Sequence, residues 1–104
     1  MRMICNGLLY DTERATVVAS YKYSTAGDFG YICEELYKTE NGRYFLAGEG
    51  GPKTKYRKRV GNSTFSGGEK LIPLKKEEVL EWFDDREIDA EEIPEDLFDV
   101  LEEA

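Results

Sequence analysis

Residues 31 to 50, YICEELYKTENGRYFLAGEG, decide the fold because they hold the strongest local signal in the chain. Two runs rich in aromatic and aliphatic residues flank Asn41-Gly42, a dipeptide typical of tight β-hairpins because both residues tolerate positive φ angles. The first run alternates, with one set at Ile32, Glu34, Leu36 and Lys38 and the other at Tyr31, Cys33, Glu35 and Tyr37. The second set has more apolar bulk, but Ile32 and Leu36 leave the buried face open.

The segments before this hairpin also read as strands and turns. Asn6-Gly7, inside MICNGLLY, predicts a short hairpin, and residues 15 to 23 are rich in the β-branched and aromatic residues that favour strands. Residues 24 to 30 have the glycines and Asp28 that turns require. After residue 69, KLIPL predicts a short strand, which Pro73 restricts to a sheet edge or a strand end.

The C-terminal third predicts helices. Val79, Leu80, Trp82 and Phe83 form an apolar stripe at helical spacing within residues 76 to 87, although Lys75 is a poor N-cap. Residues 94 to 103 contain a second amphipathic segment. Strands followed by helices favour an α+β fold, an antiparallel β-sheet built from hairpins with one or two C-terminal helices packed on one face.

The chain has the length of one domain. We expect residues 1 to 74 to form a β-rich part with a long Gly/Lys-rich loop at 48 to 70, and residues 75 to 104 an acidic helical part. The glycines of this loop let the chain leave one strand and enter the next, and its cations lie on an exposed excursion. A loop of about twenty residues is longer than a compact fold usually needs, which suggests that it binds something.

Charge is distributed unevenly. The net charge is −8, but residues 53 to 70 contain six basic residues and one acidic residue, whereas residues 71 to 104 contain three basic and fourteen acidic residues. A large acidic excess repels DNA and attracts basic surfaces, including those of nucleic-acid-binding proteins.

The sequence argues against several kinds of catalytic, phosphate-binding and metal site. The chain has no histidine, which removes imidazole bases, the common zinc sites and Ser-His-Asp triads. Gly67-Gly68-Glu69-Lys70 lacks the hydroxyl and the following helix of a phosphate-binding loop. Cys5 and Cys33 have no metal-ligand spacing and are expected to be reduced core thiols. No signal peptide or long apolar run is found, so we expect a cytoplasmic protein. Since the motifs above are missing, we also expect no metal or cofactor.

The acidic clusters suggest an interaction surface. Neighbouring carboxylates on a helix do not converge on one point, which argues against a catalytic pair or a calcium site, and a solvated face is the simplest interpretation. The alternative is a surface that imitates phosphates and occupies a basic groove of another protein. Its residues would be Glu77, Glu81, Asp84 and Asp85.

Residues 53 to 70, which we call the basic segment, allow three interpretations. Lys53, Lys55, Tyr56, Arg57, Lys58 and Arg59 have the composition of a nucleic-acid contact with one stacking aromatic ring. Against this, the acidic third of the chain would repel phosphates unless it faced away. The simpler interpretation is a solvated loop whose cations neutralise the protein's own acidic helices. The third is a nucleotide site that uses Lys55, Tyr56 and Lys70 around the glycines.

A succession of short motifs between residues 10 and 83 resembles an uncharacterised family of small acidic proteins carried by phages, plasmids and conjugative elements of bacteria. The motifs are Tyr10-Asp11-Thr12-Glu13, Gly27-Asp28-Phe29, Glu35-Leu36-Tyr37-Lys38-Thr39, Gly42, Tyr44-Phe45-Leu46, Gly48-Glu49-Gly50-Gly51, Lys55-Tyr56, Gly67-Gly68-Glu69, Ile72-Pro73-Leu74 and Glu81-Trp82. None is a catalytic signature. Arg57-Lys58-Arg59 is more basic than this family's pattern, and Lys75 stands where Ser or Thr is expected.

The resemblance implies interference with host defence, as by inhibitors of CRISPR effectors. Together with the acidic helices, it favours a non-enzymatic interaction protein of a mobile element that binds, and inhibits or modulates, a host or defence protein with a basic surface. The alternative is a nucleic-acid-binding or ribonucleoprotein-associated module that uses residues 53 to 59.

Overall fold

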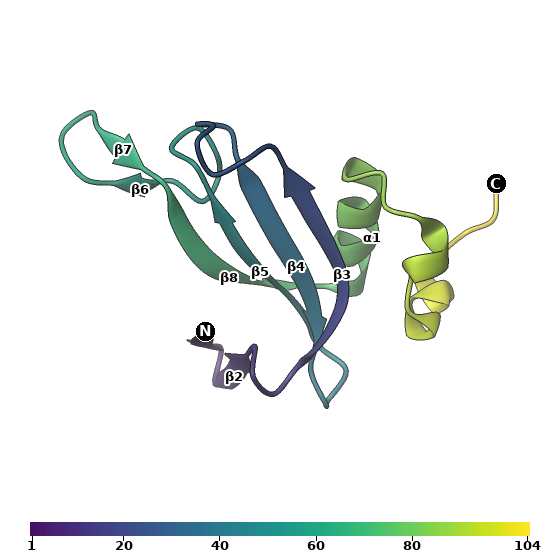
Figure 1. The fold of residues 1–104 in the computed structure, drawn as a ribbon. Helices are drawn as coiled ribbons and strands as arrows, with labels where there is room; N and C mark the ends of the chain where they lie inside the picture. Colours follow the sequence, from purple (N-terminus) through teal and green to yellow (C-terminus); the bar gives the residue numbers. More distant parts are fainter.

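A computed structural model describes all 104 residues and has the expected α+β architecture (Figure 1). A four-stranded antiparallel sheet has the order β3-β4-β5-β8, with α1 against one face. Its strands are β3 (Thr16–Tyr23), β4 (Ile32–Lys38), β5 (Tyr44–Gly50) and β8 (Gly68–Leu74). Two smaller ladders join β1 (Arg2–Cys5) to β2 (Leu8–Asp11) and β6 (Lys58–Arg59) to β7 (Phe65–Ser66). Then follow α1 (Lys76–Asp85) and the 3-10 helices η1 (Ala90–Glu92) and η2 (Glu95–Val100).

The hairpin β4–β5 forms as predicted, with Lys38 opposite Tyr44. Its turn is longer than a two-residue turn. Thr39 and Arg43 are joined by a backbone hydrogen bond, the N–H of Gly42 donates to the carbonyl of Thr39, and only Gly42 has a positive φ, of 83°. A three-residue connection of this kind places glycine at its left-handed position, so Gly42 rather than Asn41 carries the conformational requirement.

Both faces of the sheet are covered, which explains the undecided alternation in β4. On one face Leu36 and Leu46 pack against Val79, Trp82 and Phe83 of α1. On the other face the hairpin β1–β2 closes at Asn6 and Gly7, both with positive φ, and places Tyr10 against a cluster of Tyr37, Phe45 and Leu71. Because each face has its own apolar cover, both sets of alternating residues are at least partly buried. Cys5 and Cys33 are free thiols, each only partly buried.

Residues 48 to 70 are more regular than the sequence suggested. β5 continues to Gly50 and β8 begins at Gly68, with Gly50 paired to Gly68, so the irregular excursion is shorter at both ends. Within it, β6 and β7 form a small ladder that projects from the body of the molecule (Figure 1). We call residues 57 to 66 the basic arm. The expected strand at 70 to 74 is part of β8, which lies at the sheet edge that Pro73 requires.

The second predicted helix, 94 to 103, is not an α-helix. Pro94 fixes its own φ and lacks an N–H, so the chain forms two short 3-10 turns on either side of it, and the last residues are extended. α1 ends in a Schellman motif in which Glu87 is left-handed and the N–H of Ile88 donates to the carbonyl of Phe83. Ile88 thereby returns to the apolar cluster.

Candidate functional site

The four carboxylates of the predicted acidic surface all lie on α1 and are all exposed. Glu77, Glu81 and the pair Asp84 and Asp85 are three or four residues apart, so they form one stripe that extends over about 12 Å of helix. We call this stripe the acidic face. The adjacent Glu78 has a local role, because its Oε1 accepts a hydrogen bond of 2.8 Å from the backbone N–H of Lys75 and offsets the poor N-cap.

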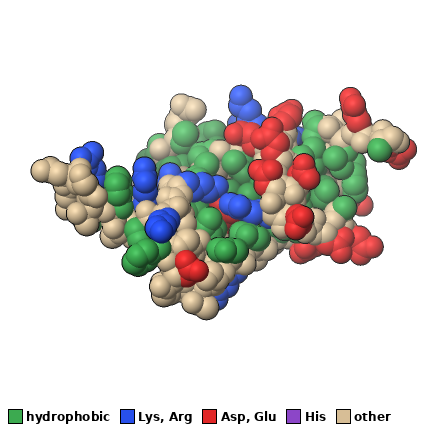
Figure 2. Space-filling model, turned by 90° about the horizontal axis from the view of Figure 1, so that it is seen from above, with side chains coloured by type: hydrophobic (Ala, Val, Ile, Leu, Met, Phe, Trp, Pro, Cys, Tyr) green, Lys and Arg blue, Asp and Glu red, His purple; other side chains and the backbone are tan.

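The acidic end of the molecule has few compensating cations. Of the acidic side chains in residues 71 to 104, only Asp96 forms ion pairs, with Lys38 at 3.1 Å and Lys76 at 3.9 Å. The other carboxylates of this segment all belong to exposed residues. In Figure 2 the Asp and Glu side chains gather at the end that contains α1, and most Lys and Arg side chains lie over the other half. The molecule therefore presents an uncompensated negative surface at one end.

The basic segment forms no ion pair with this acidic end. Its cations are exposed, but only Lys55 forms an ion pair, and its partner is Glu34 of β4 rather than any residue of α1. Arg59 donates from Nε to the carbonyl oxygen of Gly61 at 2.9 Å and also donates to the carbonyl of Asn62, which closes the tip of the basic arm. These pairs give no direct support to the simpler interpretation, neutralisation of the protein's own helices, although Lys55 borders the same hollow as Glu81 and Asp85.

Tyr56 is not the stacking aromatic ring that the sequence suggested. It is buried, with 2 % of its surface exposed, and its ring lies against Gly48. Its hydroxyl donates a 2.5 Å hydrogen bond to Oε2 of Glu34. In this position the ring is unavailable to a base. The remaining members of the predicted contact, Lys53, Lys55, Arg57, Lys58 and Arg59, are exposed.

Glu34 is the polar centre of the helix-covered face, and none of its surface is exposed. Its Oε2 accepts a hydrogen bond from the hydroxyl of Tyr56 and forms an ion pair with Nζ of Lys55, which lies 3.0 Å away. Its Oε1 accepts hydrogen bonds of 2.9 Å from Nε1 of Trp82 and from Nε of Arg86. One carboxylate therefore joins the sheet, the glycine-rich segment and α1. We call these five residues the Glu34 network.

The network holds the carboxylate ionised. Burial alone would raise the pKa of Glu34, but the four donors, Tyr56 first among them, lower it to about 2. Burial and the hydrogen bond to Glu34 raise the pKa of Tyr56 well above its usual range. The guanidinium of Arg86 also lies over the ring of Tyr21, 4.7 Å from its centroid. A buried charge satisfied in this way suits a structural junction, because removal of any donor would leave it undercompensated.

The glycines make close packing possible around this junction. A methyl group on Gly48 would overlap the Tyr56 ring, and one on Gly51 would overlap the backbone at Phe29. At Gly67, a Cβ would lie 2.7 Å from the carbonyl oxygen of Gly50. These contacts argue against the nucleotide-site interpretation, since Lys55 and Tyr56 bind a carboxylate rather than line an empty phosphate position. Lys70 lies over Tyr56, 5.9 Å from the ring centroid.

Nothing in the sequence alone connects Glu34, Trp82 and Arg86. Glu34 appeared only as one member of a strand alternation, and Trp82 only as an apolar helix residue. The sequence indicates only that Glu34 alternates with Ile32 and Leu36, so that its carboxylate lies on the same face of the strand as Leu36. Its partners are 21 to 52 residues distant in the chain, so only the fold brings them together.

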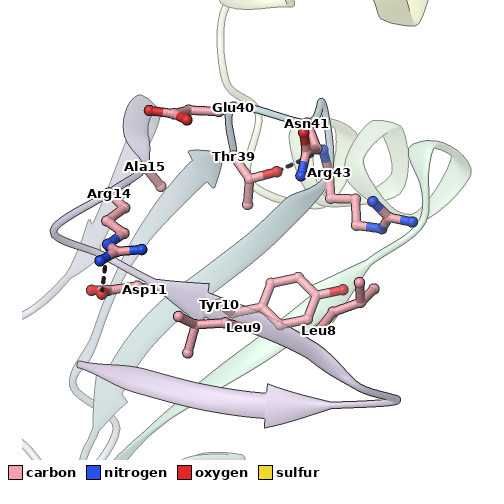
Figure 3. A pocket seen from close by; sticks show the side chains of 10 residues that line it. All are labelled: Leu8, Leu9, Tyr10, Asp11, Arg14, Ala15, Thr39, Glu40, Asn41 and Arg43. Carbon is pink, nitrogen blue, oxygen red and sulfur yellow. Dashed lines mark hydrogen bonds and ion pairs between the residues drawn. The ribbon is translucent and has the colours of Figure 1, made fainter.

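A separate pocket of about 250 Å³ lies between the β1–β2 hairpin and the turn after β4 (Figure 3). The ring of Tyr10 lines it, with Arg14 on one side and Arg43 on the other. Arg14 lies 4.0 Å from the nearly buried Asp11, and Thr39 accepts a hydrogen bond from the N–H of Arg43. The pocket is open and distant from the acidic face.

Comparison with known proteins gives no family assignment. No protein-family model matches the chain, and no characterised protein or solved structure is significantly similar to it. None of its helices has the length and apolarity needed to cross a membrane. No three acidic or cysteine side chains converge in a way that could hold a metal ion.

Proposed function

We propose that this chain is a non-enzymatic binding protein that attaches to a basic surface of another protein through the acidic face of α1. The observation that carries the proposal is the uncompensated charge of the acidic end, where Asp96 alone among the carboxylates has a cationic partner. Carboxylates without internal partners are free to pair with an external basic groove, and they increase the association rate at low salt.

Apolar side chains at the same end support a protein partner. Phe98 is 55 % exposed and Leu101 40 % exposed, both in the segment that follows α1. A binding surface usually combines an apolar centre with a charged rim, and aromatic residues are enriched among its strongest contacts.

The resemblance to mobile-element proteins supplies the context of the proposal. The partner would be a host or defence protein in the bacterial cytoplasm, and the acidic face would inhibit or modulate it by occupying a groove that normally receives phosphates. Glu34, the residue with the strongly lowered pKa, is enclosed by its donors, which supports a structural rather than a catalytic role.

A tagged pull-down from a lysate of the source bacterium, with and without nuclease treatment, tests the proposal. We expect a stoichiometric protein partner that survives nuclease and is released by salt. Loss of all partners after nuclease treatment would contradict the proposal.

A second candidate function is nucleic-acid binding by Lys53, Lys55, Arg57, Lys58 and Arg59. The observation that favours it is the position of the basic arm at the opposite end of the molecule from α1 (Figure 1). Charges more than about 8 Å apart are largely screened at physiological salt, so the acidic end does not prevent phosphate contact there. Substitution of Arg57, Lys58 and Arg59 by glutamine should then abolish a salt-sensitive affinity for nucleic acid.

A further inference from the structure

Two phenylalanines near the basic segment have no role in either core. Phe29 is 62 % exposed and Phe65 36 % exposed, and both lie outside the two apolar clusters of the sheet. The backbone carbonyl of Phe29 accepts a hydrogen bond from the N–H of Lys53, so the main chain fixes the position of this residue. Exposed aromatic rings of this kind are typical of binding surfaces.

Each ring is paired with a cation of the basic segment. The guanidinium of Arg57 lies over the ring of Phe65, 4.2 Å from its centroid, and Nζ of Lys53 lies 5.9 Å from the centroid of Phe29. Tyr23, 55 % exposed, lies beside the same loop, near Gly30. Cations and aromatic rings therefore alternate along this end of the molecule.

The segments that carry these residues are neighbours. The backbone around Gly51 touches the carbonyl groups of Asp28 and Phe29 on one side, and Gly67 approaches Gly50 on the other. In Figure 2, Lys and Arg side chains lie among hydrophobic side chains in one half of the molecule, and most acidic side chains lie in the other half.

Three acidic residues are close to the site. Glu49 and Glu69 line the hollow beside Gly51 and Gly67, and Glu49 accepts a hydrogen bond from the hydroxyl of Tyr31. The third, Asp28, has its carboxylate occupied locally. Its Oδ1 accepts from the N–H of Gly30 at 2.7 Å, and its Oδ2 accepts from the hydroxyl of Ser24 at 2.8 Å. These bonds fix the turn that presents Phe29.

We propose that this end of the chain binds single-stranded nucleic acid, with Phe29 and Phe65 as stacking surfaces and Lys53, Arg57 and Lys58 as phosphate contacts. The inference rests on the second candidate function and adds the strand preference and the stacking residues. Proteins that bind single strands combine a basic path along the backbone with aromatic rings on which bases stack. Bases in a duplex are already stacked and paired, so the rings favour single strands over duplexes.

Fluorescence anisotropy with a fluorescein-labelled oligothymidine and an oligouridine of about 15 nucleotides, and with a duplex of equal length, tests the proposal at low salt. We expect tighter binding to the single strands than to the duplex. Phe29→Ala and Phe65→Ala should each weaken single-strand binding by roughly 10-fold. Ile4→Ala removes an exposed apolar side chain of β1, outside the basic segment, and should leave the affinity unchanged.

The outcomes separate this inference from the functions proposed above. If Arg57→Gln and Lys58→Gln weaken binding but the phenylalanine variants do not, or if the duplex binds as well as the single strands, the stacking inference is wrong and only the general phosphate contact remains. Absence of any binding at low salt would remove both, and would leave protein binding by the acidic face untouched.

Discussion

The hydroxyl of Tyr56 donates a 2.5 Å hydrogen bond to the buried carboxylate of Glu34 and so joins the glycine-rich segment to the centre of the sheet. Trp82 and Arg86 reach the same carboxylate from α1. The acidic face and the start of the basic segment are therefore both anchored at one point. Because both proposed binding surfaces depend on this junction for their positions, it is the first target for testing the fold.

Replacement of Glu34 by glutamine should lower the free energy of unfolding by about 3 kcal/mol, because Lys55 and Arg86 would lose their shared counter-charge. Tyr56→Phe removes one hydrogen bond and should cost about 1–2 kcal/mol. Urea denaturation followed by fluorescence of the single tryptophan, Trp82, measures both. Glu35→Gln, on the opposite face, is the matched control, and an equal effect there would contradict a special role for Glu34.

Protonation of Glu34 at low pH should lower the free energy of unfolding. Its folded pKa of about 2 lies below the ordinary value of 4.5, so its contribution is complete above about pH 4.5 and is lost as the pH falls through 2. The shift corresponds to about 3 kcal/mol. Unfolding free energies measured between pH 7 and 2 should fall more steeply for the wild type than for Glu34→Gln. Parallel curves would show that other carboxylates cause the acid sensitivity.

Substitution of Gly48 by alanine should displace Tyr56, because the added methyl group overlaps its ring. We expect a loss of about 2–4 kcal/mol from the clash and the broken hydrogen bond. Gly27→Ala is the control, since a Cβ there meets nothing within 4 Å, and its effect should stay within about 0.5 kcal/mol. Thermal unfolding of both variants decides the point; equal stability would argue against close packing at Gly48.

Local patterns in the sequence predicted the strands of the two larger hairpins and of the main sheet, both Asn-Gly turns and the first helix, but not β6 and β7. They failed where the outcome depended on neighbours far along the chain. The alternation in β4 could not reveal the buried face, because the β1–β2 hairpin covers the side that α1 does not. The 3-10 geometry around Pro94 was missed because the amphipathic pattern outweighed the effect of one proline.

For the candidate site, the sequence located the charged surfaces but not their connections. The four carboxylates of the acidic face are exposed on one stripe because they occupy the positions that Val79, Trp82 and Phe83 leave to solvent. Tyr56 was misplaced because composition alone cannot distinguish a stacking ring from a buried one. Phe29 and Phe65 were overlooked because isolated aromatic residues in loops carry no periodic signal.

The most direct test of the account is a pull-down from nuclease-treated lysate with a variant in which Glu77, Glu81, Asp84 and Asp85 are replaced by their amides. The matched control neutralises four exposed carboxylates outside α1: Glu13, Glu40, Glu49 and Glu69. We expect the acidic-face variant to lose the partner, with a flatter salt dependence, while the control keeps it. Equal capture of the partner by the wild type and by the acidic-face variant would contradict binding through this surface.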